Sequence, residues 1–262
     1  MKNEIMPIGV TVSGADPLAS LEKVVSLGMF TCQMSAPPEE WWSREGIRLI
    51  RETAEEKKIK ITSLIFGVDL VNPAMRGKRV LKVFSYSDFA LELRIKVIQT
   101  HIGVIPEDRN DLNYKGLVLA LQKIADYCRE NNQSFALETG QERASVLSKF
   151  IEDVNRLNMG VNFDPANMLL YDEDDPIKAL DILGKYVIGV HCKDGKRPER
   201  KGELGKEYPL GEGDVGIEKF IDKLKKIGYT GPLTIEREIS GEKQIRDILK
   251  AKELLEKLVN KE

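Results

Sequence analysis

Short apolar runs alternate with amphipathic segments along this chain, and that alternation restricts the fold more than any other feature. Each run is rich in the β-branched and aromatic residues that favour strands, and a segment with helical periodicity follows it, at roughly thirty residues per unit. The predicted strands are 8–12, 30–34, 59–66, 95–100, 135–138, 160–164, 187–191 and 232–236.

Residues that begin or interrupt helices place the boundaries of several connecting segments. Asp16 followed by Pro17 predicts a capped helix start. Asn72-Pro73 and Gly77 predict a loop before a helix over 79–93, and repeated glycines predict a long loop over 195–216.

Eight strand–helix units in succession indicate an α/β chain that folds as a (β/α)8 TIM barrel. Residues 1–262 are expected to form one catalytic domain, because such barrels typically need about 250 residues. A doubly wound open sheet is the alternative. Its nucleotide-binding version has little support, since no G-x-G-x-x-G follows the first predicted strand.

The overall composition excludes several classes of partner. A net charge of −2 provides no strongly basic surface, so we expect no nucleic-acid partner. No apolar run approaches the roughly 20 residues of a membrane span. The three cysteines, Cys32, Cys128 and Cys192, are odd in number and form no C-x-x-C pair, which favours a reduced cytoplasmic setting.

Four predicted strands end in an ionisable residue: Glu138, Asp164, His191 and Glu236. Side chains alternate between the faces of a strand, so these residues share a face with small or polar neighbours. Those neighbours are Ala136, Asn162, Gly189 and Thr234. The intervening residues Leu137, Phe163, Val190 and Ile235 are large and apolar, as expected for packing against surrounding helices. The four ionisable residues are therefore predicted to point into the barrel.

Three carboxylates and one imidazole form a set of ligands for a divalent cation. Any one of the acids, taken alone, is equally well explained as a helix cap or a surface charge, but four at matching positions favour a metal site. Mixed oxygen and nitrogen ligation suits Mn²⁺, with Mg²⁺, Co²⁺ or Zn²⁺ as alternatives. A metal held in this way is suited to proton transfer next to a ketone.

The strand ends resemble those of a known family. Leu137-Glu138-Thr139, Phe163-Asp164-Pro165-Ala166-Asn167, His191-Cys192-Lys193-Asp194 and Ile235-Glu236 are similar to motifs of the xylose-isomerase-like sugar isomerase/epimerase superfamily. Within it the chain resembles ketose 3-epimerases of the D-tagatose 3-epimerase type, hydroxypyruvate isomerases and inosose dehydratases. The resemblance implies that Glu138, Asp164, His191 and Glu236 bind the metal. It also implies that Glu138 and Glu236 exchange protons on opposite faces of a cis-enediolate.

The same resemblance identifies candidate substrate-binding residues. Arg197 matches a substrate-binding arginine of the epimerases, whereas Asn167 stands where they carry a histidine. A second glutamate of the epimerases has no counterpart at the same spacing, and Glu142 is a candidate substitute. His101 and Lys193 are further candidates for contacts with a substrate.

Aromatic residues after the second and third strands have two interpretations. Trp41, Trp42 and Phe66 either form an apolar wall against a sugar or pack between helices.

The leading interpretation is a metal-dependent isomerase or epimerase of a ketose or keto-sugar acid. A dehydratase or lyase of a keto-sugar, inosose or 3-keto-glycoside shares the first proton abstraction and is the alternative. A DNA-repair endonuclease is disfavoured by the presence of only two histidines, and a non-catalytic sugar-binding barrel remains a fourth reading. We expect a small-molecule sugar substrate and self-association as a dimer or tetramer, by analogy with the resembling proteins.

Overall fold

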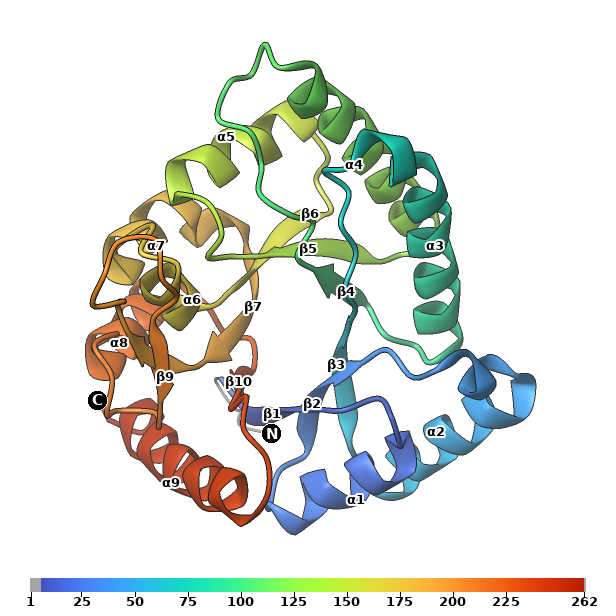
Figure 1. The fold of residues 1–262 in the computed structure, drawn as a ribbon. Coiled ribbons are helices and arrows are strands. Elements are labelled where there is room, and N and C mark those ends of the chain that lie inside the picture. Colours follow the sequence, from blue (N-terminus) through green and yellow to red (C-terminus); the bar gives the residue numbers. More distant parts are fainter. Residues whose placement is uncertain (1–5, 262) are drawn as a thin grey trace.

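All eight predicted apolar runs form parallel strands of one closed barrel (Figure 1). The computed structural model describes residues 6–261. Around the barrel the strands follow the order β1-β10-β7-β6-β5-β4-β3-β2. Their bounds are β1 (Ile8–Val12), β2 (Thr31–Ser35), β3 (Lys60–Ile65), β4 (Val97–Thr100), β5 (Ser134–Glu138), β6 (Met159–Phe163), β7 (Val187–Cys192) and β10 (Leu233–Ile235). The predicted (β/α)8 barrel is confirmed.

Helices surround the barrel and follow the strands in sequence (Figure 1). They are α1 (Pro17–Ser26), α2 (Arg44–Glu56), α3 (Pro73–Glu92), α4 (Leu112–Glu130), α5 (Ala144–Val154), α6 (Pro165–Leu170), α7 (Pro176–Leu183), α8 (Ile217–Lys226) and α9 (Glu242–Val259), with short 3₁₀ helices η1 (Glu39–Trp42) and η2 (Gly184–Tyr186). None of the described helices is long and apolar enough to cross a membrane.

Local capping explains one correct prediction and one error. The Asp16 side chain accepts a hydrogen bond from the backbone N–H of Ala19, which starts α1 where the sequence predicts. The predicted loop at 72–77 is wrong, because Asn72 caps the backbone N–H of Ala74 and Pro73 occupies the first turn of α3. The helix therefore begins six residues before its predicted start.

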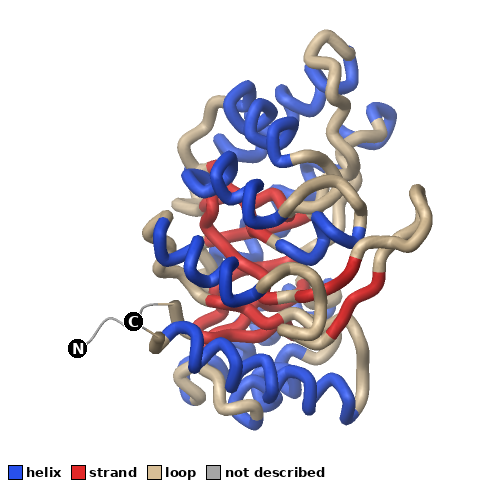
Figure 2. Tube along the Cα trace, turned by 90° about the vertical axis from the view of Figure 1, so that its left-hand side faces the viewer, coloured by secondary structure: helices blue, strands red, loops and turns tan. Residues whose placement is uncertain are grey.

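Residues 195–216, predicted as a loop throughout, include strand residues. β8 (Asp194–Lys196) and β9 (Lys206–Tyr208) pair as an antiparallel hairpin. The Asp194 carboxylate holds the following segment in place by accepting hydrogen bonds from the backbone N–H groups of Gly195, Gly211, Gly213 and Val215. The hairpin and its loop project beyond the barrel, directly after the carboxyl end of β7 (Figure 2).

The two faces of the strands differ as the sequence predicts. Phe163 points outward and stacks on Phe220 of α8, with ring centroids 5.8 Å apart. Gly189 faces the interior, where a Cβ atom would lie 2.4 Å from Asn162 Oδ1. The helices thus cover an apolar outer face of the barrel, whereas its interior carries buried polar side chains. This polar interior supports the site at the carboxyl ends of the strands.

Candidate metal centre and active site

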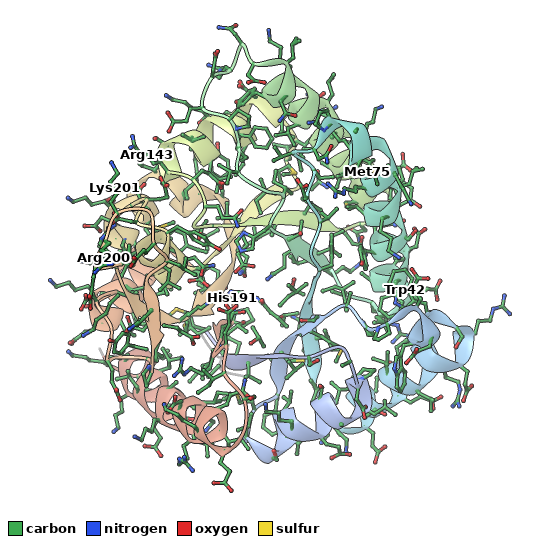
Figure 3. All side chains as sticks on the ribbon, in the orientation of Figure 1. Trp42, Met75, Arg143, His191, Arg200 and Lys201 are labelled. Atoms are coloured by element: carbon green, nitrogen blue, oxygen red, sulfur yellow. The ribbon has the colours of Figure 1, made fainter. Side chains whose placement is uncertain are left out.

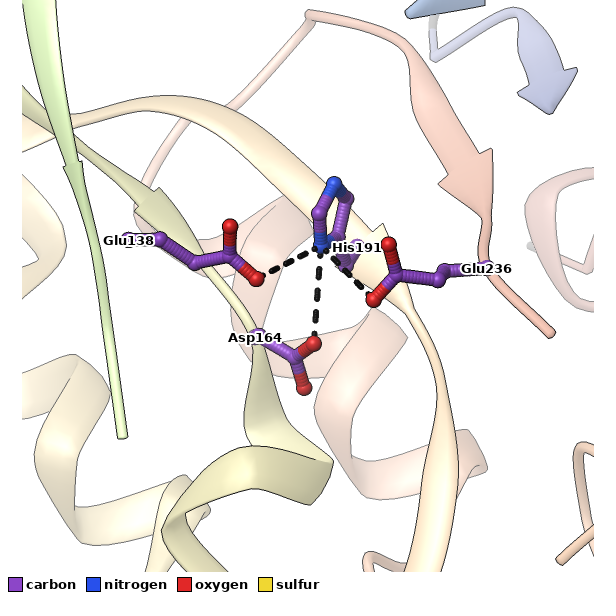
Figure 4. Close-up of side chains that lie close together, drawn as sticks. All are labelled: Glu138, Asp164, His191 and Glu236. Carbon is purple, nitrogen blue, oxygen red and sulfur yellow. Dashed lines mark ion pairs between the residues drawn. The ribbon is translucent and has the colours of Figure 1, made fainter. Parts of the chain in front are cut away.

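The structure brings Glu138, Asp164, His191 and Glu236 together at the carboxyl end of the barrel (Figure 4). His191 Nδ1 lies 3.3 Å from Glu138 Oε1, 3.4 Å from Asp164 Oδ2 and 3.3 Å from Glu236 Oε2. All four ligand atoms lie within 4.8 Å of one another. They come from four neighbouring strands, because β5, β6, β7 and β10 are consecutive around the barrel.

The hydrogen bonding of these atoms fits a bound cation. His191 Nδ1 and Asp164 Oδ2 are buried and have no hydrogen-bond partner among the described residues. The other carboxylate oxygen of Asp164 accepts from the backbone N–H of Asn167 at 2.9 Å, which caps α6 and leaves Oδ2 available. Buried polar atoms without a partner are costly, and separations of 3.3–3.4 Å suit ligands that lie about 2.0–2.4 Å from one ion.

Gln33 orients the imidazole, a role that sequence reasoning missed. Its Oε1 lies 2.8 Å from His191 Nε2 and serves as the acceptor for an Nε2–H donor. Gln99 Nε2 donates to the same Oε1 at 3.0 Å, and Ser63 Oγ donates to Gln99 Oε1 at 2.8 Å. In its neutral form, with the proton on Nε2, His191 presents the lone pair of Nδ1 to the cluster.

Replacing Gln33 therefore tests this orientation. We expect Gln33→Met to weaken metal affinity by about 10–100-fold, the usual cost of losing an outer-shell partner of a histidine ligand. Competition with a fluorescent chelator measures the change. Ser63→Ala is the matched control, since it removes only the outer bond of the chain and keeps the bond to His191. Equal affinity in wild type and Gln33→Met would contradict the assigned role.

A cavity of about 650 Å³ opens beside the cluster. Glu138 and Glu236 line this cavity, whereas Asp164 and His191 are fully buried beneath it. Each glutamate directs one oxygen to the cluster. The other oxygens, Glu138 Oε2 and Glu236 Oε1, accept no hydrogen bond from another described residue. These two oxygens are therefore available to exchange protons with a bound molecule.

Electrostatics keep the two glutamates ionised. Burial by itself raises the pKa of Glu138, but the charge of His191 and a hydrogen bond with His101 outweigh it, so this pKa lies below its usual range. Burial also raises the pKa of Glu236, but the charge of His191 outweighs it and lowers this pKa to about 2. In return, the carboxylates raise the pKa of His191 despite its burial. A cation bound at this cluster would displace a proton from His191, so its affinity would depend on pH.

Three other predicted residues lie against the cluster. Lys193 Nζ is buried and lies 3.1 Å from Glu236 Oε2 and 2.8 Å from Glu238 Oε2. Asn167 bridges the two sides, because it accepts from Lys193 Nζ and donates to Glu138 Oε1, both at 3.3 Å. His101 lines the cavity, and its Nε2 lies 3.5 Å from Glu138 Oε1.

The structure places Arg197 and Glu142 outside the wall of this cavity. Arg197, in the loop after β8, pairs with Asp172 and donates to the backbone oxygen of Asp174 at 2.5 Å. Arg200 and Lys201 of the same segment point outward at the edge of the molecule (Figure 3). Glu142 is buried, and its carboxyl accepts a backbone hydrogen bond from Ile105.

Burial raises the pKa of Glu142 from 4.5 to about 7, which predicts a pH-dependent stability. The folded protein binds this proton more tightly than the unfolded chain. Below pH 4.5 Glu142 is protonated in both states and does not lower the free energy of unfolding. Between pH 4.5 and 7 its ionisation increasingly destabilises the fold, and above pH 7 the destabilisation reaches its maximum.

We expect Glu142→Gln to raise the free energy of unfolding by about 3 kcal/mol at pH 8 and to leave it unchanged near pH 4. Urea unfolding at both pH values, in the presence of metal, measures the difference. The matched control is Glu107→Gln, at an exposed position of the loop between β4 and α4. It should leave the free energy of unfolding unchanged at both pH values. An equal gain at pH 4 and pH 8 would contradict the explanation by ionisation.

A family model described as xylose isomerase-like TIM barrel matches residues 21–258. A solved structure of a xylose isomerase domain protein from Planctomyces limnophilus is 39% identical, with a TM-score of 0.92 over 97% of each chain. An uncharacterized protein of Methanocaldococcus jannaschii is 26% identical over 254 residues, which cover 90% of this chain and 83% of that protein.

A further relative carries the name of an activity. The L-ribulose 3-epimerase of a Methylomonas species is 28% identical over 147 residues, which cover 53% of this chain and 48% of that enzyme. The family match extends over most of the barrel and includes the strands that carry the four clustered side chains. By this match and by its closed eight-stranded barrel, the chain belongs to the xylose isomerase-like TIM barrel family.

Proposed function

We propose that this protein is a divalent-metal-dependent sugar epimerase or isomerase. Its substrate is a ketose or keto-sugar acid, and the reaction moves a proton on a carbon next to the ketone through a cis-enediolate. The observation that carries the proposal is the pair of cavity-lining glutamates, Glu138 and Glu236, on opposite sides of His191 (Figure 4). The relationship to an L-ribulose 3-epimerase supports the same reaction class.

The positions of the two glutamates suit proton transfer at both faces of one carbon. Two strands, β6 and β7, separate β5 from β10 around the barrel, so the carboxylates approach a bound sugar from different sides. One glutamate takes the proton from the carbon next to the ketone. The other, after taking up a proton from solvent, donates that proton to the opposite face. This exchange inverts the carbon without a redox cofactor.

Further residues assist these two carboxylates. Lys193 fixes one oxygen of Glu236, and Asn167 fixes one oxygen of Glu138, while the second oxygen of each accepts no hydrogen bond from a described residue. His101 lies at the cavity wall beside Glu138 and is placed to hydrogen-bond a substrate hydroxyl. Phe66 provides an apolar wall.

A cation bound by Glu138, Asp164, His191 and Glu236, with Mn²⁺ favoured over Mg²⁺, Co²⁺ or Zn²⁺, would polarise the ketone and stabilise the charge of the enediolate.

Proton exchange in D₂O tests the proposal. The protein, loaded with Mn²⁺, is incubated with a panel of ketoses, keto-sugar acids and inososes, and the products are analysed by mass spectrometry and, after the metal is removed, by NMR. We expect deuterium to enter a carbon beside the carbonyl of a substrate that loses neither water nor an aglycone. Loss of water or of an aglycone would instead support the dehydratase or lyase. A complete lack of exchange across the panel would count against both reactions.

A further inference from the structure

A second hollow adjoins the catalytic cavity at the carboxyl end of the barrel. It has a volume of about 550 Å³, and the loops that follow β1 and β2 form much of its wall. The two hollows share four lining residues: Ser13, Ser35, Ala36 and Tyr86. This shared wall makes the second hollow a continuation of the space above Glu138 and Glu236.

A row of stacked aromatic rings connects the two hollows. Phe66, in the wall of the catalytic cavity, stacks on Tyr86 with centroids 4.3 Å apart. Tyr86 meets the edge of Trp42 at 5.3 Å, and Trp42 stacks on Phe89 at 4.9 Å. The indole N–H of Trp42 donates to the backbone oxygen of Pro37 at 2.9 Å, which fixes the ring. The result is a continuous aromatic wall that extends from the catalytic cavity into the second hollow.

The row of rings extends away from the metal cluster. Trp42 lies beside α3 in the layer of helices, whereas His191 lies near the centre of the barrel (Figure 3). A molecule that reacts at Glu138 and Glu236 therefore has room to extend along this wall. Each hollow alone falls in the range of about 300–1,000 Å³ that is typical of pockets for drug-sized ligands, so a single ketose leaves the second hollow free.

The polar groups of the second hollow indicate an uncharged ligand. Lys82 Nζ lies 4.7 Å from the ring centroid of Trp42 and forms an ion pair with Glu39. This pair neutralises the lysine, and none of the described residues that line the catalytic cavity is a lysine or arginine. An ammonium, a carboxylate and the hydroxyls of Ser13 and Ser35 match the donors and acceptors of a sugar, whereas a phosphate would lie close to Glu39.

We propose that the substrate carries a second, uncharged sugar unit, which binds in the hollow formed by Trp42, Lys82 and Glu39 while the keto-sugar unit reacts at the metal cluster. This inference rests on the proposed function, because it takes the reacting unit to be a keto-sugar. It adds that the enzyme prefers a ketodisaccharide or a related keto-glycoside to a free ketose.

Relative exchange rates test the preference. The Mn²⁺-loaded protein is assayed in D₂O with D-fructose and with three ketodisaccharides whose glucosyl unit is linked through O4, O5 or O6 of fructose, namely maltulose, leucrose and isomaltulose. We expect kcat/KM for at least one disaccharide to exceed that for fructose by tenfold or more. Fructose exchanging as fast as all three would overturn the inference and leave the proposed function intact.

A pair of lysine variants assigns the preference to the second hollow. Lys82→Met should reduce the ratio of disaccharide to fructose kcat/KM to below threefold. Lys78→Met, one turn earlier on α3 at an exposed position that lines neither hollow, should preserve the ratio. An unchanged ratio in Lys82→Met would refute the assigned subsite.

Fluorescence provides a measurement that does not depend on turnover. The chain has two tryptophans, so a Trp41→Phe background reports on Trp42 alone. We expect at least one disaccharide of the panel to change this signal at a tenfold lower concentration than fructose does. If no sugar exchanges protons, that failure counts against the proposed function, and the fluorescence titration alone tests the second hollow. Half-maximal signal change at the same concentration of disaccharide and fructose, or no signal change, would reject the proposed subsite.

Discussion

Glu236→Gln should lower the rate of proton exchange into a substrate by about 10²–10⁴-fold, the usual contribution of a positioned general acid or base. Glutamine keeps the shape of the side chain and an oxygen toward the cluster, but it has no carboxylate to accept a proton. Lys193 retains Glu238 as a partner at 2.8 Å, so the buried ammonium stays paired and the fold should persist. Deuterium incorporation measured by NMR at saturating metal gives the rate.

Glu238→Gln is the matched control for this variant. Glu238 also lines the cavity and contacts Lys193, but it lies outside the ligand cluster. We expect its replacement to cost less than tenfold. Metal content is measured for both variants, because Glu236 is also a proposed ligand and its two roles must be separated. Full exchange activity in a metal-loaded Glu236→Gln protein would remove Glu236 as the base.

His191→Ala should abolish tight metal binding. His191 Nδ1 faces three carboxylate oxygens at 3.3–3.4 Å, so the substitution removes the nitrogen ligand from the centre of the cluster. The loss of affinity should exceed the roughly 10–100-fold expected for an outer-shell change such as Gln33→Met. Elemental analysis after dialysis measures the retained metal, and far-UV circular dichroism verifies that the barrel is folded.

The chain provides its own control for the loss of an imidazole. His101 is the only other histidine in the sequence, and it also lies beside Glu138, at 3.5 Å. Because His101 is not part of the ligand cluster, His101→Ala should retain its metal. Wild-type metal content in His191→Ala, or equal loss in both variants, would discredit the proposed ligand set.

Local sequence patterns determine which way the residues of a strand face. The alternation of residues in strands predicts that Phe163 faces a helix and that Gly189 faces the barrel interior, and both positions are as expected. The predicted boundaries fail where capping and pairing decide them. Asn72 begins α3 early, and residues 194–208 form a hairpin in place of a loop. Short polar segments carry little periodicity, so their structure depends on the groups they meet.

The sequence alone determined the barrel and the approach of Glu138, Asp164, His191 and Glu236, because the closure of parallel strands brings their carboxyl ends to one face. The tertiary structure alone decided that Gln33 orients His191 and that Lys82 lies over Trp42. These contacts join residues 158 and 40 positions apart, on elements whose own patterns do not specify which neighbour they meet. The approach of strand ends follows from a repeated local pattern, whereas side-chain partners depend on how separate elements pack.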